Sequence, residues 1–194
     1  MEPVMRLRIP DSWQSYDLSG NDLAQRRAAV LRTLPEAGRR AEVNRWFRDL
    51  RAMLGDARRR GAVYAAGTVA MHDDGLLVAT LGVFQLRIPG GRTLELPDLM
   101  RLAGLGGADP GREIRMVRLP HAGPAARIRA RQSVPLGQHG SVEQLVVHTL
   151  VPLPVGRRLL LVTCASPTLA LADPLADLFE AITDTLRLDG VAAA

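Results

Sequence analysis

The sequence has no lysine, a single cysteine and few aromatic residues, and each shortage excludes something. One cysteine, Cys164, cannot form an intrachain disulfide or a cysteine-based zinc site. No stretch reaches the roughly 18 consecutive apolar residues that a membrane-spanning helix needs. The first residues also lack the apolar run of a signal peptide, so we expect a cytoplasmic protein. With aromatic residues at only 4%, the core has to be built from Leu, Val, Ile and Ala.

Positive charge is distributed unevenly along the chain. All 25 basic residues are Arg, so an Arg at one position is not by itself evidence of a phosphate site. Residues 36–60 carry a net charge of +4 and residues 112–140 carry +5, whereas residues 141–194 carry −3. The molecule is therefore expected to be polarised. The overall charge of +5 is too modest to indicate a dedicated nucleic-acid binder.

The N-terminal part of the chain predicts one strand and two helices. Residues 4–18 alternate apolar and polar side chains before a Pro-Asp break, which predicts a strand entering a turn, and Ser19 is a candidate helix cap. One helix is expected over about 23–34. A longer helix over 35–60, with Gly61 as its C-cap, carries an apolar stripe that would pack on a sheet. The residues of this stripe are Val43, Phe47, Leu50 and Leu54.

The remainder of the chain consists mainly of predicted strands. Residues 62–71 and 76–88 flank an Asp-Gly pair, which predicts a β-hairpin. A short helix over 94–103 and a glycine-rich loop over 104–111 come next. A run of four strands follows, and an amphipathic helix from Pro174 closes the chain. The four strands are expected at 112–120, 125–134, 142–151 and 159–165.

This order of elements predicts an α+β fold. Consecutive strands joined by short connections favour an antiparallel sheet, here of about six or seven strands, flanked by helices. No linker interrupts the pattern, so residues 1–190 are expected to form a single domain and residues 191–194 a frayed tail.

Several short motifs within this order resemble those of the Mog1/PsbP-like superfamily, and of uncharacterised proteins of high-GC bacteria in particular. The chain has Leu-Arg-Ile-Pro-Asp-Ser-Trp at residues 7–13, Ser166-Pro167 at the end of a strand, and a closing helix with Phe179-Glu180-Ala181-Ile182. The resemblance implies an α/β/α arrangement. Because members of the superfamily mostly bind other proteins, it also implies a binding role, such as an adaptor or chaperone of a secretion-type system.

Candidate catalytic residues are few. Cys164 lies in an apolar strand, and His148 in the preceding strand is either its neighbour or on the opposite face, depending on a one-residue shift of register. We expect Cys164 to be buried and unreactive. The four histidines do not show a metal-ligand spacing, and no metal or cofactor is expected. The segment 104–111 lacks the strand-then-helix context of a phosphate-binding loop, and Ser166 lacks the G-x-S-x-G elbow of a hydrolase.

The strongest constellation is electrostatic. Three Arg alternate along one predicted strand, so their side chains are expected on one face, and further Arg lie on the strand before it. This face is either a solvated side of the sheet or a docking surface for an acidic protein partner. The candidate protein-binding residues are Arg115, Arg118, Arg127, Arg129 and Arg131.

Together these features predict a non-enzymatic protein-binding module with an acidic protein partner. The alternative is a small-ligand-binding domain, or a hydrolase, that uses the groove between sheet and helices. Nucleic acid ranks third, because the Arg strands lack aromatic stacking residues. The sequence indicates no membrane association and leaves homo-oligomerisation open.

Overall fold

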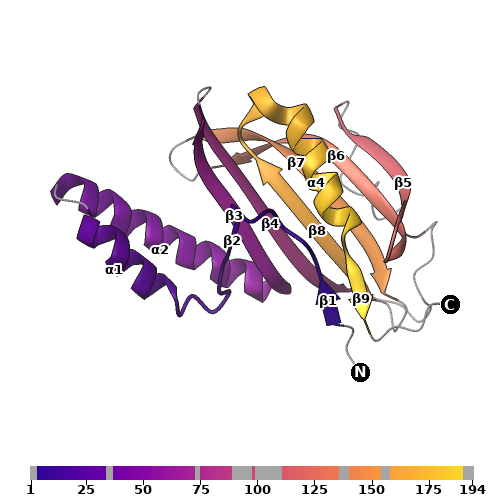
Figure 1. Ribbon diagram of the computed structural model, residues 1–194, viewed down its shortest axis with the longest axis horizontal. Helices are drawn as coiled ribbons and strands as arrows, with labels where there is room; N and C mark the ends of the chain where they lie inside the picture. The colour runs from indigo at the N-terminus through magenta and orange to yellow at the C-terminus, as the bar shows by residue number, and fades with distance from the viewer. Residues whose placement is uncertain are drawn as a thin grey trace.

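The computed structural model of the chain describes residues 4–33, 37–72, 75–88, 98, 111–135, 140–153 and 158–189 (Figure 1). The predicted helix 94–103 and loop 104–111 lie outside these ranges, apart from Asp98 and Gly111, as does the tail 191–194. None of the helices within the described ranges combines the length and the hydropathy that crossing a membrane requires. The helices are α1 (Leu23–Thr33), α2 (Ala37–Arg59), the 3-10 helix η2 (Leu169–Leu171) and α4 (Ala172–Asp184). The strands are β1 (Val4–Arg6), β2 (Gln14–Ser15), β3 (Ala62–His72), β4 (Gly75–Arg87), β5 (Glu113–Leu119), β6 (Gly123–Pro135), β7 (Ser141–Leu153), β8 (Arg158–Ser166) and β9 (Arg187–Asp189).

A seven-stranded antiparallel sheet, in the order β2-β3-β4-β8-β7-β6-β5, confirms the predicted α+β fold. The predicted hairpin forms between β3 and β4, with His72 opposite Gly75. The four predicted strands are β5 to β8, and each pairs with the next along the chain. The last of them, β8, also pairs with β4 and so joins the hairpin to the other strands in the middle of the sheet.

The N-terminal segment differs from the single strand predicted for residues 4–18. It forms two short strands in different sheets, because β1 pairs with β9 near the C-terminus whereas β2 pairs with β3. The break between them is a turn in which the Trp13 N–H donates to the Pro10 carbonyl at 2.9 Å. Proline has no N–H for a strand ladder, which is one reason why the strand does not continue through residue 10.

Helix α4 covers one face of the large sheet (Figure 1). Its apolar side packs on the central strands through Leu175, Phe179 and Ile182, all of them buried. The Phe179 ring meets Trp13 edge to face, with ring centroids 6.3 Å apart. The buried sheet residues of this core include Leu81, Val83, Leu145, Val147, Val151, Leu160, Val162 and Cys164.

Helices α1 and α2 form a hairpin at the β2–β3 edge, against the opposite face of the sheet, and extend beyond that edge (Figure 1). The two faces are distinguished by neighbouring residues of β3, because Ala66 belongs to the core beneath α4 whereas Ala65 packs against the α2 cluster. The predicted glycine C-cap is confirmed, since α2 ends at Arg59 and Gly61 has a φ of +91°. The predicted stripe is also confirmed, with Phe47, Leu50 and Leu54 buried and Val43 packed against them.

Candidate functional site

Arg127, which was predicted to lie on an exposed strand face, is buried, and this corrects the sequence-based expectation for that residue. The side chain of Arg127 on β6 is only 5% exposed. Its guanidinium donates to Glu180 Oε2 at 2.7 Å, to Thr183 Oγ1 at 2.8 Å and to Asp184 Oδ1 at 2.7 Å. These three groups belong to the second half of α4, where the helix dipole also favours a cation. Arg127 is therefore committed to holding α4 on the sheet.

Two further candidates also bind α4. Arg129 forms an ion pair with Asp173 in the first turn of the helix, and Arg115 on β5 donates to Glu180 at 2.5 Å. Arg129 is half-buried, whereas Arg115 is exposed. The sequence had indicated an acidic partner for this face, and for these Arg side chains the acids come from α4 of the same chain.

Arg118 and Arg131, the remaining two candidates, are exposed. They do not lie together, because Arg118 is three positions after Arg115 on the same strand and so faces the other side of the sheet. A role for them in binding another protein stays a prediction.

Cys164 and His148 lie on opposite faces of the sheet. In the pairing of β7 with β8, His148 is opposite Thr163, and Cys164 is opposite Val147. The His148 ring shares a hydrogen bond of 2.9 Å with Thr163 Oγ1 and does not face the thiol. Burial raises the pKa of the Cys164 thiol to about 12, despite the opposing effect of Arg127. Cys164 is thus buried as predicted, and the pair cannot act as nucleophile and base.

Ser166 has a structural role at the end of β8. Its hydroxyl donates to the Val78 carbonyl at 2.6 Å and accepts from the Thr168 N–H at 3.1 Å. These bonds support the interpretation of Ser166 as a strand end. Within the described ranges, His, Cys, Asp and Glu side chains do not gather in threes that could hold a metal ion.

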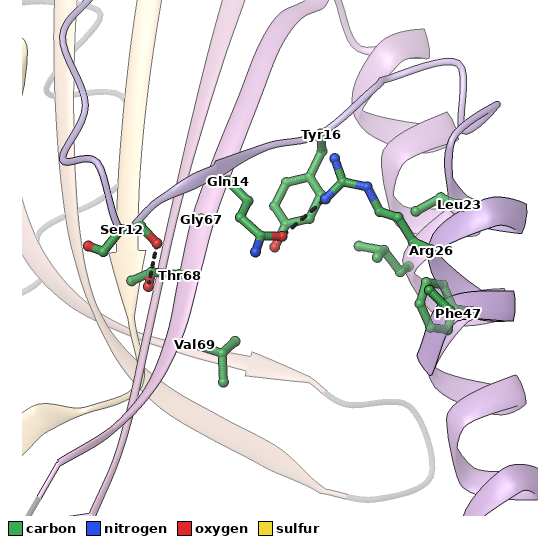
Figure 2. Close-up of a pocket in the computed structure, with 11 residues that line it drawn as sticks. Ser12, Gln14, Tyr16, Leu23, Arg26, Phe47, Gly67, Thr68 and Val69 are labelled. Atoms are coloured by element: carbon green, nitrogen blue, oxygen red, sulfur yellow. Dashed lines mark hydrogen bonds between the residues drawn. The ribbon is translucent and has the colours of Figure 1, made fainter. Parts of the chain in front are cut away.

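A cleft of about 370 Å³ lies between the β2–β3 edge and the helical hairpin (Figure 2). Val69 projects into it from β3 and is 62% exposed. On the opposite wall, Arg26 of α1 reaches across to Gln14, to which its Nη1 donates at 3.1 Å. The same guanidinium bonds Asp22 and the Ser15 carbonyl. Arg26 is the basic residue among the described lining residues of this cleft, and its guanidinium is already bonded to protein groups. The small-ligand alternative is therefore supported only by the volume of the cleft.

A second and larger hollow, of about 790 Å³, is the groove between α1 and α2. It is lined by Arg27 from α1 and by Arg45 and Arg51 from α2, which are exposed and form no ion pair with the side chains that the structure describes. Arg48 lines the same groove. No acidic side chain is among the lining residues that the structure describes. This arrangement can attract and hold a ligand that presents several negative charges.

The helical hairpin also carries the net charge of the molecule. Residues 23–59 contain ten Arg and four acidic residues, a net charge of +6, whereas the whole chain sums to +5. The rest of the chain therefore sums to −1. Sequence reasoning recorded the excess of Arg in 36–60 but assigned the site to the strands instead. The groove could have been predicted by considering the Arg-rich segment 36–60 together with Arg27 on the preceding helix.

Comparisons with known proteins add little to this picture. No protein-family model matches the chain, and no curated protein matches its sequence. Among solved structures, one that is similar is LpqN, which is involved in cell envelope biogenesis of Mycobacterium tuberculosis. It shares 14% sequence identity, and the match covers 96% of this chain and 84% of that chain with a TM-score of 0.49. Likeness of this degree carries no inference about function, and membership in the Mog1/PsbP-like superfamily stays a prediction.

Proposed function

We propose that this chain is a protein-binding module whose partner is acidic, and that the partner binds the helical hairpin of α1 and α2. An adaptor or chaperone role in a secretion-type system, which the Mog1/PsbP-like resemblance implies, is the form of this function that we favour. A cytoplasmic location, which is our expectation from the sequence, belongs to the same proposal.

The observation that carries the proposal is a group of three Arg side chains in the groove that form no ion pair with the side chains that the structure describes. On the sheet, Arg127 and Arg129 are neutralised by carboxylates of α4. In the groove, Arg27, Arg45 and Arg51 lie together without a carboxylate among the described lining residues. Like charges held close together repel, so a partner that neutralises them gains electrostatic free energy on binding.

A protein suits this surface better than a nucleic acid does. Single-stranded nucleic acids are generally held by aromatic side chains on which the bases stack. Phe47 is the one aromatic residue among the described lining residues, and it is only 7% exposed. The groove therefore offers charge without a stacking surface.

A pull-down from the native host tests the proposal with three immobilised proteins. One is the wild type, the second is R27S/R45S/R51S, and the third is R8S/R87S/R187S. The third variant removes the same number of exposed charges outside the groove, so net charge is matched. Thermal melts of both variants verify that they fold, since exposed substitutions usually cost within about 0.5 kcal/mol each.

We expect the wild type and the matched control to retain the same acidic protein, and the groove variant to retain much less of it. Retention should also fall as salt is raised from about 50 to about 300 mM, because exposed charges are then screened. If all three proteins retain the same set of proteins in the same amounts, the groove is not the binding surface and the proposal fails.

A further inference from the structure

We propose that the segment of the partner bound in this groove is an acidic α-helix, which lies along α2 between the two helices of the hairpin. This inference rests on the proposed function and specifies the class of partner. It is drawn from the spacing of the Arg side chains, from the shape of the groove floor and from the way this chain already binds its own acidic helix.

The spacing of the groove cations matches the spacing of carboxylates on a helix. Arg45 and Arg51 both line the groove and lie six residues apart on α2, so their Cα atoms are separated by a rise of about 9 Å. Carboxylates at positions i, i+4 and i+7 of a second helix span about 10.5 Å. Arg27 lies across the groove on α1 and can pair with the other side of the same helix.

The floor of the groove accepts a helix at close range. Ala24 of α1 and Ala41 of α2 are exposed, and their small side chains let a third backbone approach. Leu23 and Phe47 beneath them are already 4% and 7% exposed, so docking buries little additional apolar surface. The affinity must then come mainly from charge, which favours fast, salt-sensitive and transient association.

The molecule itself contains an example of this mode of binding. Its helix α4 carries Asp173, Asp177, Glu180 and Asp184, at intervals of four, three and four residues, and no basic residue. Three of these carboxylates bind Arg side chains of the sheet, whereas Asp177 is exposed. Because these three acids are already paired, α4 of a second copy offers few free carboxylates, and we assign the groove to a different protein.

An anionic membrane is a weaker candidate for the same groove. A membrane-binding surface combines basic residues with large apolar side chains that enter the lipid. The large apolar side chains among the described lining residues, Leu23 and Phe47, are buried. An acidic helix can bind the Arg side chains of the groove while Leu23 and Phe47 stay buried.

The test uses synthetic peptides as probes on the full chain. The first is a capped peptide of about 18 residues, long enough to be helical in water, with Glu at i, i+4, i+7 and i+11 and Ala and Leu on the adjoining face. The second replaces each Glu by Gln. The third has the same four Glu residues and the same charge, but two central residues are replaced by Pro, which prevents a helix. Fluorescence anisotropy measures their binding to the wild type, to R27S/R45S/R51S and to R8S/R87S/R187S.

We expect the acidic helix to bind the wild type and the matched control equally, and the groove variant about tenfold or more weakly, from three exposed ion pairs. The Gln peptide should bind the wild type at least as weakly as the acidic helix binds the groove variant. If the Pro-containing peptide bound as tightly as the acidic helix, the groove would accept any acidic segment. That result would overturn the helix inference, while the proposed function would stand.

Other outcomes also separate the two claims. If no acidic peptide binds but the pull-down partner is retained in a groove-dependent way, the helix inference is wrong and the protein-binding function stands. If vesicles of anionic phospholipid bind in a groove-dependent way at salt concentrations where the acidic helix does not, the groove recognises a membrane surface and the inference is overturned. If the second copy of this chain is the ligand, anisotropy of the labelled protein will rise with its own concentration, which also overturns it.

Discussion

Arg127 and Glu180 face each other at 2.7 Å between the sheet and α4, and the same guanidinium also reaches Asp184 at 2.7 Å. The two carboxylates lie four residues apart on α4 and so share one side of the helix. Arg115 binds the second oxygen of Glu180, which links β5 to the same cluster. Arg115, Arg127 and Arg129 thus fix the position of the closing helix, and the cations that we propose for partner binding are Arg27, Arg45 and Arg51 of the hairpin.

Replacing Arg127 by Met should destabilise the fold by about 3 kcal/mol, because removal of one partner leaves carboxylates without their buried counter-ion. The cost is placed at the lower end of the usual range, since Glu180 keeps Arg115 and the Asp184 side chain is 47% exposed. Urea unfolding measures the change. Arg131→Met on the same strand is the control and should cost within about 0.5 kcal/mol. Equal midpoints for the two variants would show that the cluster does not hold α4.

His148 should make the protein lose stability in mild acid. Burial, with a further contribution from Arg112, lowers the pKa of His148 to about 4 from its ordinary value of 6.5. Between these two pH values the unfolded chain binds more protons than the folded one, so the free energy of unfolding falls as pH falls from 6.5 to 4. The loss attributable to this residue is about 3 kcal/mol.

The matched variant for this prediction is His148→Gln, which has no titrating group and can still bond Thr163 Oγ1. Urea unfolding of both proteins at a series of pH values gives the difference in their slopes. We expect the variant to have the flatter profile in this window. Parallel profiles would mean that His148 is protonated in the folded protein as readily as in the unfolded chain.

Cys164 should react with thiol reagents only when the sheet opens. Its thiol is fully buried beneath α4, and its raised pKa of about 12 leaves about one molecule in ten thousand as thiolate at pH 8. The rate of labelling by a disulfide reagent should therefore rise with urea in step with the population of the unfolded state. Complete reaction in concentrated denaturant serves as the control. Rapid labelling in native buffer would contradict the burial of this residue.

Much of the fold could be predicted from local patterns. The Asp-Gly pair between two alternating runs predicted the β3–β4 hairpin, and the stripe that contains Phe47 and Leu50 predicted how α2 packs. The pairing of β8 with β4 was not predicted, because local patterns do not tell which strands far apart in the sequence become neighbours. The Pro-Asp break at residue 10 predicted the turn, but local patterns did not predict that the strands on either side of it join different sheets.

The surface that we propose for binding was harder to predict than the fold for a related reason. Alternation along a strand shows that Arg127 and Arg129 share a face, but it does not show which element covers that face. The answer was in the closing helix, where Asp173, Glu180 and Asp184 recur at helical spacing on one side. Matching that acidic series to the Arg series would have predicted an internal ion-pair cluster and would have directed attention to the hairpin.

The junction between α2 and β3 yields the last prediction, which concerns Gly61. Residues other than glycine rarely adopt its φ of +91°, and a Cβ added there would lie 2.8 Å from the Gln85 carbonyl oxygen. The backbone cannot simply move away, because the Gln85 N–H donates to the Gly61 carbonyl at 2.8 Å. Gly140 has a similar φ of +88°, and no atom of the described residues lies within 4 Å of the position of a Cβ there, so it isolates the backbone strain from the clash. We expect Gly140→Ala to cost about 1 kcal/mol and Gly61→Ala about 2–4 kcal/mol in urea unfolding, the excess arising from overpacking against β4. Equal costs would mean that the end of α2 adjusts freely, and that the hairpin is held to the sheet by its apolar stripe alone.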